Sequence, residues 1–228
     1  MRKVFLCIVI IFLPLYIFFK GVEFNAFNKN FYLNSYEKNQ VEHITGMELD
    51  ELEMITDNIF SYLKDNSQEE ALNPYFNSKE IKHMEDVKTL FKWGFKIKNI
   101  SLILSLIGIV GLFILDEGDR IAKGIFYGNF IWWTIILILF LLITMDFNKY
   151  FTYFHTIFFD NDLWLLDPKE DLLIQMLPEE FFISIFNRIL LFFISTLAII
   201  QLTSYIVMKK GKDFYGFISY IKRLFQQD

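Results

Sequence analysis

Four long apolar runs constrain most strongly how this chain can fold. They cover residues 4–19, 100–115, 125–145 and 181–208, and Leu, Ile and Phe dominate them. A helix of about 20 apolar residues crosses the hydrocarbon core of a bilayer. The 228-residue chain is 54% hydrophobic and has 28 phenylalanines, more than a soluble domain of this size can bury. We therefore predict an all-α integral membrane protein with four transmembrane helices.

The first run is predicted to remain in the protein as a membrane anchor. It follows Arg2 and Lys3, as in a secretory signal, but Phe18-Phe19-Lys20-Gly21 offers no pair of small residues to a signal peptidase. The run is short for a span. We therefore expect flanking interfacial residues or local bilayer thinning to compensate.

Charge predicts which side of the membrane holds both termini. Four spans bring the two termini to the same side. Arg2, Lys3 and five basic residues of the tail 209–228 mark this side as cytoplasmic. The turn 116–124 is expected on the same side.

Two segments are then predicted to be extracytoplasmic, residues 20–99 and 146–180. We expect them to form a helical cap that belongs, with the spans, to a single membrane domain over residues 1–228. The second segment has few basic residues, Lys149 and Lys169, as the positive-inside rule expects of an outer loop. The outer side also holds every histidine of the chain: His43, His83 and His155.

Two helices are predicted within the first outer segment. Met47–Leu63 is amphipathic, with apolar residues at helical spacing and acidic residues on the other face. Lys79–Lys98 is expected to begin after Ser78 as N-cap and to continue into the second span. Gly21–Tyr36, rich in Asn and aromatics, is predicted to be irregular.

The histidines are the first candidates for chemistry. His155 lies in an aromatic stretch beyond the third span, where it is either the polar tip of an interfacial belt or a catalytic imidazole. His83, read alone, is a solvated helix residue. Asp86 lies three residues further along the same helix face and can fix the tautomer of His83. His43 has no evident partner and is interpreted as structural.

An acidic loop and an arginine inside a span are two further candidate sites. Asp160-Asn161-Asp162 with Asp167 resembles a cation loop, but the glycine and terminal glutamate of a calcium loop are missing, which favours turn formation. Arg188 lies inside the fourth span, where it either binds a partner or extends to the outer surface. The single Cys7 and the histidine spacing provide no metal ligand set, and no basic block indicates nucleic acid.

Taken together, three motifs resemble the lipoprotein intramolecular transacylase family, Lit. They are Lys82–Lys88, Phe154–Pro168 and Leu177–Phe182, and their order and the four-span layout agree with that family. The resemblance implies a bacterial plasma-membrane enzyme without a cofactor. It would act on lipoproteins whose N-terminal cysteine carries a diacylglyceryl group, and move the sn-2 acyl chain to that cysteine's α-amino group. The product is a lyso-form lipoprotein.

The same resemblance implies that His83 and His155 are the functional histidines, and the chemistry agrees. Aminolysis of an ester requires a base for the amine and a donor for the oxyanion. Alternatively, one histidine carries the acyl group. We therefore predict that both side chains meet on the extracytoplasmic side. Asp86 is the candidate supporting residue, and the candidate substrate-binding residues are Arg188, Tyr153 and Trp164.

Two other functions remain open at this stage. One is a lipid-ester hydrolase, or another membrane acyltransferase, that uses the same histidines. The other is a non-catalytic membrane scaffold. The expected partners are the diacylated lipoprotein and membrane lipid. Because acyl chains stay in the membrane, we expect Met47–Leu63 and Tyr150–Trp164 to cover a pocket that opens sideways near the outer leaflet.

Overall fold

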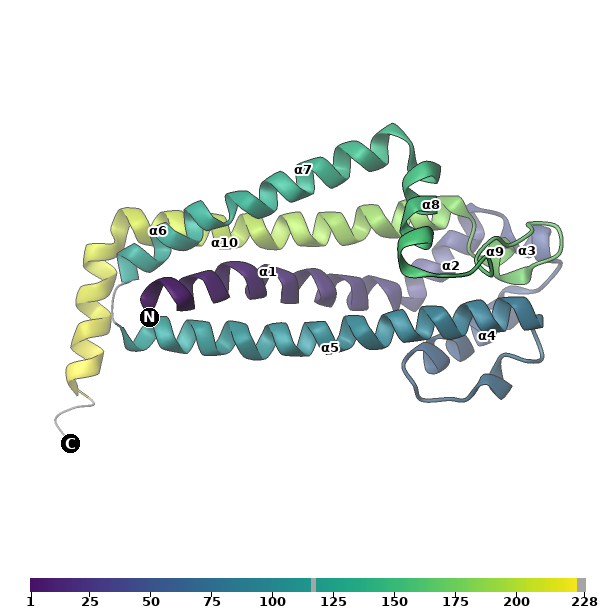
Figure 1. Ribbon diagram of the computed structural model, residues 1–228, viewed down its shortest axis with the longest axis horizontal. Helices are drawn as coiled ribbons and strands as arrows, with labels where there is room; N and C mark the ends of the chain where they lie inside the picture. The colour runs from purple at the N-terminus through teal and green to yellow at the C-terminus, as the bar shows by residue number, and fades with distance from the viewer. Residues whose placement is uncertain (116–117, 225–228) are drawn as a thin grey trace. The chain divides into compact units, whose positions relative to one another are not determined.

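The described chain is built from helices alone. The computed structural model describes the backbone of residues 1–115 and 118–224 and the side chains of residues 1–115 and 121–209, and none of these residues is in a β-strand. The ten α-helices and one 3₁₀ helix (Figure 1) are α1 (Arg2–Ala26), α2 (Lys29–Lys38), α3 (Val41–Thr45), α4 (Leu49–Leu63), η1 (Glu69–Ala71), α5 (Ser78–Ile114), α6 (Gly118–Gly128), α7 (Phe130–Met145), α8 (Phe147–Phe158), α9 (Leu172–Met176) and α10 (Glu179–Leu224). The predicted all-α class is confirmed.

Four helical stretches are long and apolar enough to cross a membrane. Within the described residues they are Arg2–Ala26, Ser78–Ile114, Ile121–Met145 and Glu179–Lys209, so the number of candidate spans equals the number predicted. The first helix has 25 residues, and at about 1.5 Å per residue it needs no bilayer thinning. Part of the predicted turn 116–124 and the basic side chains beyond Lys209 lie outside the described residues.

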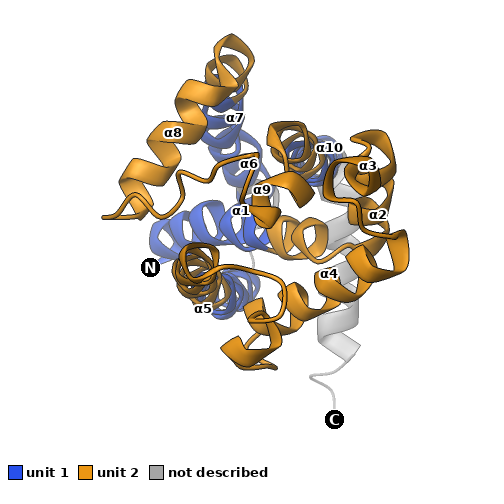
Figure 2. Ribbon diagram, turned by 90° about the vertical axis from the view of Figure 1, so that its right-hand side faces the viewer, with its two compact units in different colours: residues 1–19, 97–139, 190–228 blue, residues 20–96, 140–189 orange. Residues whose placement is uncertain are grey.

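The chain divides into two compact units (Figure 2). Unit 1 comprises residues 1–19, 97–139 and 190–228, and unit 2 comprises residues 20–96 and 140–189. In unit 1, α1 packs closely on α5 at two glycines. A Cβ on Gly108 would lie 2.7 Å from Cγ2 of Val9, and one on Gly111 would lie 2.7 Å from the Phe5 ring. Small residues of this kind let membrane helices approach each other.

Trp132 compensates for a proline in α1. Pro14 has no N–H, so the carbonyl of Ile10, four residues earlier, loses its helical hydrogen bond. The indole Nε1 of Trp132 donates to that carbonyl oxygen at 2.7 Å, and its ring packs edge-on against Phe193. In an apolar environment an unsatisfied carbonyl is costly. Trp132 therefore packs inside unit 1, where its side chain is half-buried.

Unit 2 has its own hydrophobic core, which α4 supplies in large part. Leu52 and Ile55 of α4 are fully buried, and Ile59 is almost so. They pack in one cluster with aromatic residues of α2 and with Ile81 and Met84 of α5. The helix predicted at Met47–Leu63 thus exists, but its apolar face forms the core. That this helix covers a substrate pocket stays a prediction.

The segment Gly21–Tyr36 is helical, contrary to the prediction. The first helix continues to Ala26, and α2 begins after Asn28, whose side chain accepts a hydrogen bond from the N–H of Phe31 at 3.1 Å. Burial explains the difference. Three aromatic side chains of α2 lie in the core of unit 2, and their burial outweighs the weak local helix propensity of this segment: Phe31, Tyr32 and Tyr36.

Asn77, one residue before the predicted cap, caps α5. Its side-chain oxygen accepts from the N–H groups of Lys79 and Glu80 at 2.9 and 3.1 Å. In return, the carboxylate of Glu80 accepts from the N–H of Asn77 at 2.8 Å. This reciprocal pair is a capping box, which stabilises the first turn of α5. The first turn is therefore fixed just before His83.

Candidate functional site

His83 and His155 meet inside unit 2, as the sequence predicts. His83 lies in the charged first half of α5, and His155 lies in α8, which begins after the N-cap Asp146. Each side chain is only 7% exposed. The ring centroids are 6.1 Å apart, with 36° between the ring planes. Two imidazoles from distant parts of the chain thus form one buried pair.

One hydrogen bond determines the tautomer of His155. Its Nδ1 lies 2.7 Å from the carbonyl oxygen of Phe151, one turn earlier in α8. A carbonyl oxygen can only accept, so Nδ1 carries the proton and Nε2 keeps a lone pair. His155 therefore offers Nε2 as a base or a nucleophile. The acceptor is a backbone carbonyl, which every residue has, so no spacing in the sequence singles this bond out.

Aromatic side chains enclose His155. The indole of Trp164 stacks on the imidazole, with centroids 4.8 Å apart and planes 27° apart. The Phe151 ring lies at 4.3 Å and the Phe159 ring at 5.5 Å. Phe159 also contacts His83 edge-on at 5.4 Å. The pair therefore lies among apolar rings that exclude water.

The enclosure keeps both imidazoles neutral near pH 7. Burial, together with the charge of His155, lowers the pKa of His83 to about 4, although Asp86 opposes this shift. Burial also lowers the pKa of His155, and the bond to the Phe151 carbonyl opposes that shift. A neutral imidazole can accept a proton, whereas an imidazolium cannot. Both imidazoles are therefore in the form that can accept a proton.

Asp86 lies near His83 but binds another residue. Its carboxylate accepts from the side-chain amide of Asn161 at 2.9 Å. The buried Nδ1 of His83 has no hydrogen-bond partner among the described residues. Asp86 therefore acts on His83 through its charge, and no Asp86 bond to Nδ1 fixes the tautomer. A buried nitrogen without a partner is unusual, and a catalytic role is one of the explanations for such an atom.

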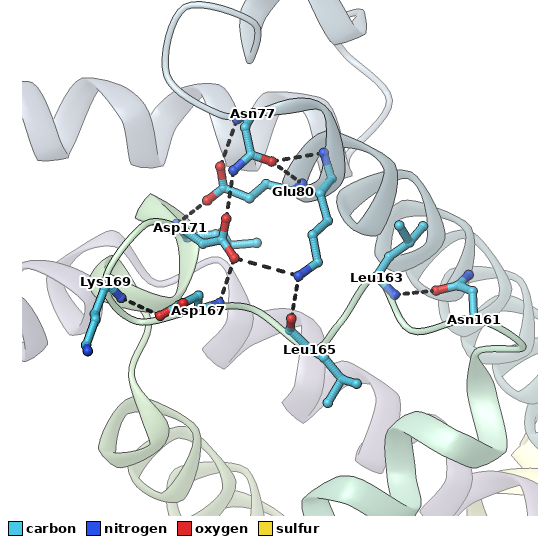
Figure 3. A network of polar contacts seen from close by, with 10 residues as sticks. Asn77, Glu80, Asn161, Leu163, Leu165, Asp167, Lys169 and Asp171 are labelled. Atoms are coloured by element: carbon cyan, nitrogen blue, oxygen red, sulfur yellow. Dashed lines mark hydrogen bonds and ion pairs between the residues drawn. The ribbon is translucent and has the colours of Figure 1, made fainter.

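The acidic loop after α8 forms turns. Asn161 accepts from the N–H of Leu163 at 3.0 Å, and Asp167 accepts from the N–H of Lys169 at 2.9 Å (Figure 3). Short polar side chains typically stabilise turns in this way. No group of three or more His, Cys, Asp or Glu in the described chain is placed to hold a metal. The turn interpretation of this loop is therefore favoured.

Arg188 contacts other residues of unit 2. Its Nε donates to the side-chain oxygen of Asn25 at 3.2 Å, and its guanidinium lies 4.8 Å from the centroid of the Phe31 ring. Asn25 is buried and also donates to the carbonyl of Gly21 at 2.8 Å. Arg188 thus has a partner on α1.

Tyr153 and His43 are also apart from the histidine pair. Tyr153 is 49% exposed and precedes His155 by two residues, so the two side chains diverge by about 200° around α8. Its ring lies 5.8 Å from Nζ of Lys149. His43 is exposed in α3. Of the three candidate substrate-binding residues, only Trp164 contacts a histidine of the pair.

The chain is similar to proteins of a known family. A family model described as lipoprotein intramolecular transacylase Lit matches residues 7–182. A protein of Aquifex aeolicus (strain VF5), described as uncharacterized, is 31% identical over 191 residues. These cover 79% of this chain and 84% of that protein.

Solved structures share the fold. The membrane integral lipoprotein intramolecular transacylase Lit from Bacillus cereus superposes with a TM-score of 0.82 at 24% identity, and the match covers 94% of this chain and 98% of that one. A variant of that protein with one histidine changed to alanine gives a TM-score of 0.74 at 22% identity, covering 93% and 96%. These likenesses show that the fold is shared.

Proposed function

Because this chain belongs to the lipoprotein intramolecular transacylase family, Lit, and is an acyltransferase of the membrane, we propose a specific reaction for it. The enzyme moves the sn-2 acyl chain of an S-diacylglyceryl cysteine to the α-amino group of the same cysteine. The product is an N-acyl, S-monoacylglyceryl lipoprotein. The observation that carries this proposal is the buried pair of neutral imidazoles, with centroids 6.1 Å apart.

His155 is proposed as the base. The α-amino group of the substrate, with a pKa near 8, attacks the ester in its neutral form, after its ammonium has released one proton to solvent. As the C–N bond forms, Nε2 of His155 accepts a second proton from this nitrogen, because Nδ1 is already bound to Phe151. A C–N bond forms as the ester C–O bond breaks, and the proton passes to the departing glycerol oxygen. No other reactant is needed.

His83 is proposed to stabilise the oxyanion. Attack on the ester places negative charge on the carbonyl oxygen, and an N–H donor stabilises that charge strongly in a dry site. The unpartnered Nδ1 of His83 has an unmet hydrogen bond that a substrate oxygen can satisfy once the site admits it. A route through an acyl-histidine remains the alternative mechanism, with Nε2 of His155 as nucleophile.

Neighbouring residues are proposed to support these roles. Asp86 favours the protonated form of His83 electrostatically. Trp164 keeps the imidazole plane of His155 in place by stacking. Tyr153 and Arg188 stay substrate-binding candidates for parts of the lipoprotein away from the reacting atoms, because both have exposed side chains.

The reaction is proposed to take place at the extracytoplasmic face of the plasma membrane of a bacterium. The basic residues at both termini support a cytoplasmic location of the termini, and with four spans the segments 20–99 and 146–180 would lie on the opposite side. Both histidines belong to these segments. Lipoproteins carry their acyl chains in the membrane, so the ester need not leave the bilayer surface to reach the site.

Transfer is favoured over hydrolysis by the surroundings of the pair. Both histidines are 7% exposed and are packed against aromatic rings. A site that excludes water suppresses attack by water on the ester. The amine and the ester belong to one substrate molecule, so holding them together supplies much of the rate increase.

Mass spectrometry of a synthetic diacylated lipopeptide tests the proposal. Purified protein should yield a lyso product of unchanged mass whose fragment ions place one acyl chain on the α-amino group. Free fatty acid with loss of mass would instead indicate a hydrolase. A His83→Ala, His155→Ala double variant is the control. If it leaves the acyl pattern of every lipoprotein as it is in the wild type, the protein is a non-catalytic scaffold.

A further inference from the structure

We propose that Lys79, Glu80 and Asp171 are positioning residues that hold Trp164 in its stack on His155. The inference rests on the proposed function only in treating His155 as the reactive side chain. All the contacts that carry it lie within unit 2. We call these three residues, with Asn77, the α5 latch.

The α5 latch connects the start of α5 with the start of α9. Glu80 is 1% exposed, and its second carboxylate oxygen accepts from the N–H of Leu173 at 2.7 Å. Asp171, 5% exposed, accepts from the side-chain amide of Asn77 at 2.7 Å. It also accepts from the N–H of Asp167 at 2.6 Å. Two buried carboxylates therefore hold one end of the loop 159–171 on α5 (Figure 3).

Lys79 extends the α5 latch to the residue beside Trp164. Its ammonium donates to the carbonyl oxygen of Leu165 and lies 3.9 Å from the carboxylate of Asp171. Leu165 is 52% exposed, so core packing does not hold it. The neighbouring indole stacks on His155 at 4.8 Å. The hydrogen bond from Lys79 thus fixes the backbone that orients the indole.

The other end of the loop is held separately. Asn161 donates to Asp86 and accepts from the N–H of Leu163. The loop therefore meets α5 at two points, with Trp164 between them. Losing the contact with Lys79 should release the indole while the helices stay folded, because Lys79 is 42% exposed at the side chain and lies outside the core.

Fluorine NMR of protein labelled with 5-fluorotryptophan tests the α5 latch independently of activity. The four tryptophans give four resonances, and a Trp164→Phe variant assigns the one from Trp164. His155→Ala should shift this resonance only. In Lys79→Met, the same resonance should move towards its position in His155→Ala and broaden. Lys79→Arg, which keeps a charged donor, should restore it.

Kinetics of lipopeptide transfer provide the second measurement. Lys79→Met should lower kcat about tenfold and change KM less than twofold, because the substrate still binds while His155 is poorly oriented. Lys169→Met is the matched control. Lys169 is in the same loop, and Figure 3 shows its side chain directed away from the α5 latch. This variant should match the wild type in both measurements.

Four results would contradict the proposal or separate it from the proposed function. An unchanged Trp164 resonance in Lys79→Met would overturn the proposal, and so would disturbance of all four resonances, which indicates a general loss of folding. The expected NMR shift in a protein that shows no transfer in any variant would keep the α5 latch and reject the proposed function. If Lys169→Met lowered kcat as much as Lys79→Met does, the loss of a positive charge near the loop would explain both results, and the proposal would be rejected.

Discussion

The carbonyl oxygen of Phe151 accepts a hydrogen bond from Nδ1 of His155 at 2.7 Å. The donor and the acceptor lie one turn apart in α8, and the orientation of the packed imidazole brings them together, whereas Nδ1 of His83 in α5 makes no such bond. The bond in α8 leaves Nε2 of His155 as the nitrogen able to react. We therefore expect replacement of His155 to lower the transfer rate more than replacement of His83.

Replacing either histidine of the pair should reduce transfer. His155→Ala removes the proposed base and should lower kcat by about 10²- to 10⁴-fold. His83→Ala removes the proposed oxyanion donor and should cost about 10²- to 10³-fold. Product formation from the diacylated lipopeptide measures both. His43→Ala, at an exposed histidine of α3, is the control, and activity should survive it. Full activity in His155→Ala would reject the mechanism.

Replacing Asp86 by Asn should have a smaller effect. The charge of Asp86 raises the pKa of His83 against the effect of burial, so the neutral amide should let that pKa fall further. We expect a partial loss of kcat, well short of the loss in His83→Ala, and an altered acidic limb of the pH profile. Asn161→Ala is a useful comparison, because it removes the hydrogen-bond partner and keeps the carboxylate. Activity equal to that of His83→Ala would contradict this supporting role.

Chelators should leave the transfer rate unchanged. The proposed reaction uses ring nitrogens and the substrate amine, and it balances its proton without a metal. Incubation with EDTA or a zinc-selective chelator, followed by the lipopeptide assay, measures this. Inhibition that added zinc reverses would favour a metal-dependent hydrolase.

Acid should destabilise the fold through His83. Its pKa is lowered from 6.5 to about 4 by burial, so between these values the unfolded chain binds a proton that the folded chain does not. Stability from this group is complete above about pH 6.5 and is lost as pH falls towards 4. The full cost is of the order of 3 kcal/mol.

The difference in thermal midpoint between the wild type and His83→Gln isolates this effect. As pH falls from 7 to 4.5, the thermal midpoint of the wild type should fall more than that of His83→Gln. Taking the difference is necessary because burial raises the pKa of Glu80, which acts in the opposite direction. A difference that stays constant with pH would contradict the assignment.

Truncation on the apolar face of α4 should unfold unit 2. Ile55 is fully buried, so Ile55→Ala should cost about 2–5 kcal/mol. Glu51→Ala, on the exposed face of the same helix, should change stability little. Thermal denaturation in detergent measures both. If Ile55→Ala kept the midpoint of the wild type and only weakened substrate binding, α4 would line the pocket after all.

The sequence by itself determined the features that depend on local periodicity and composition. The apolar runs predict four membrane helices, and the residues around His83 and His155 carry the family resemblance. Helical spacing also predicts α4 and the long α5. These features follow from neighbours along one helix, where apolar and polar faces can be read from a spacing of three to four residues.

Only the tertiary structure decided which groups meet. The 6.1 Å between His83 and His155, the stack of Trp164, and the hydrogen bond from Trp132 to Ile10 each join residues far apart in the sequence. The helical segment Gly21–Tyr36 was missed because buried aromatic contacts, which are not local, outweigh its propensity. Asp86 likewise accepts a hydrogen bond from Asn161, in a loop 75 residues away in the sequence, and not from His83 on its own helix.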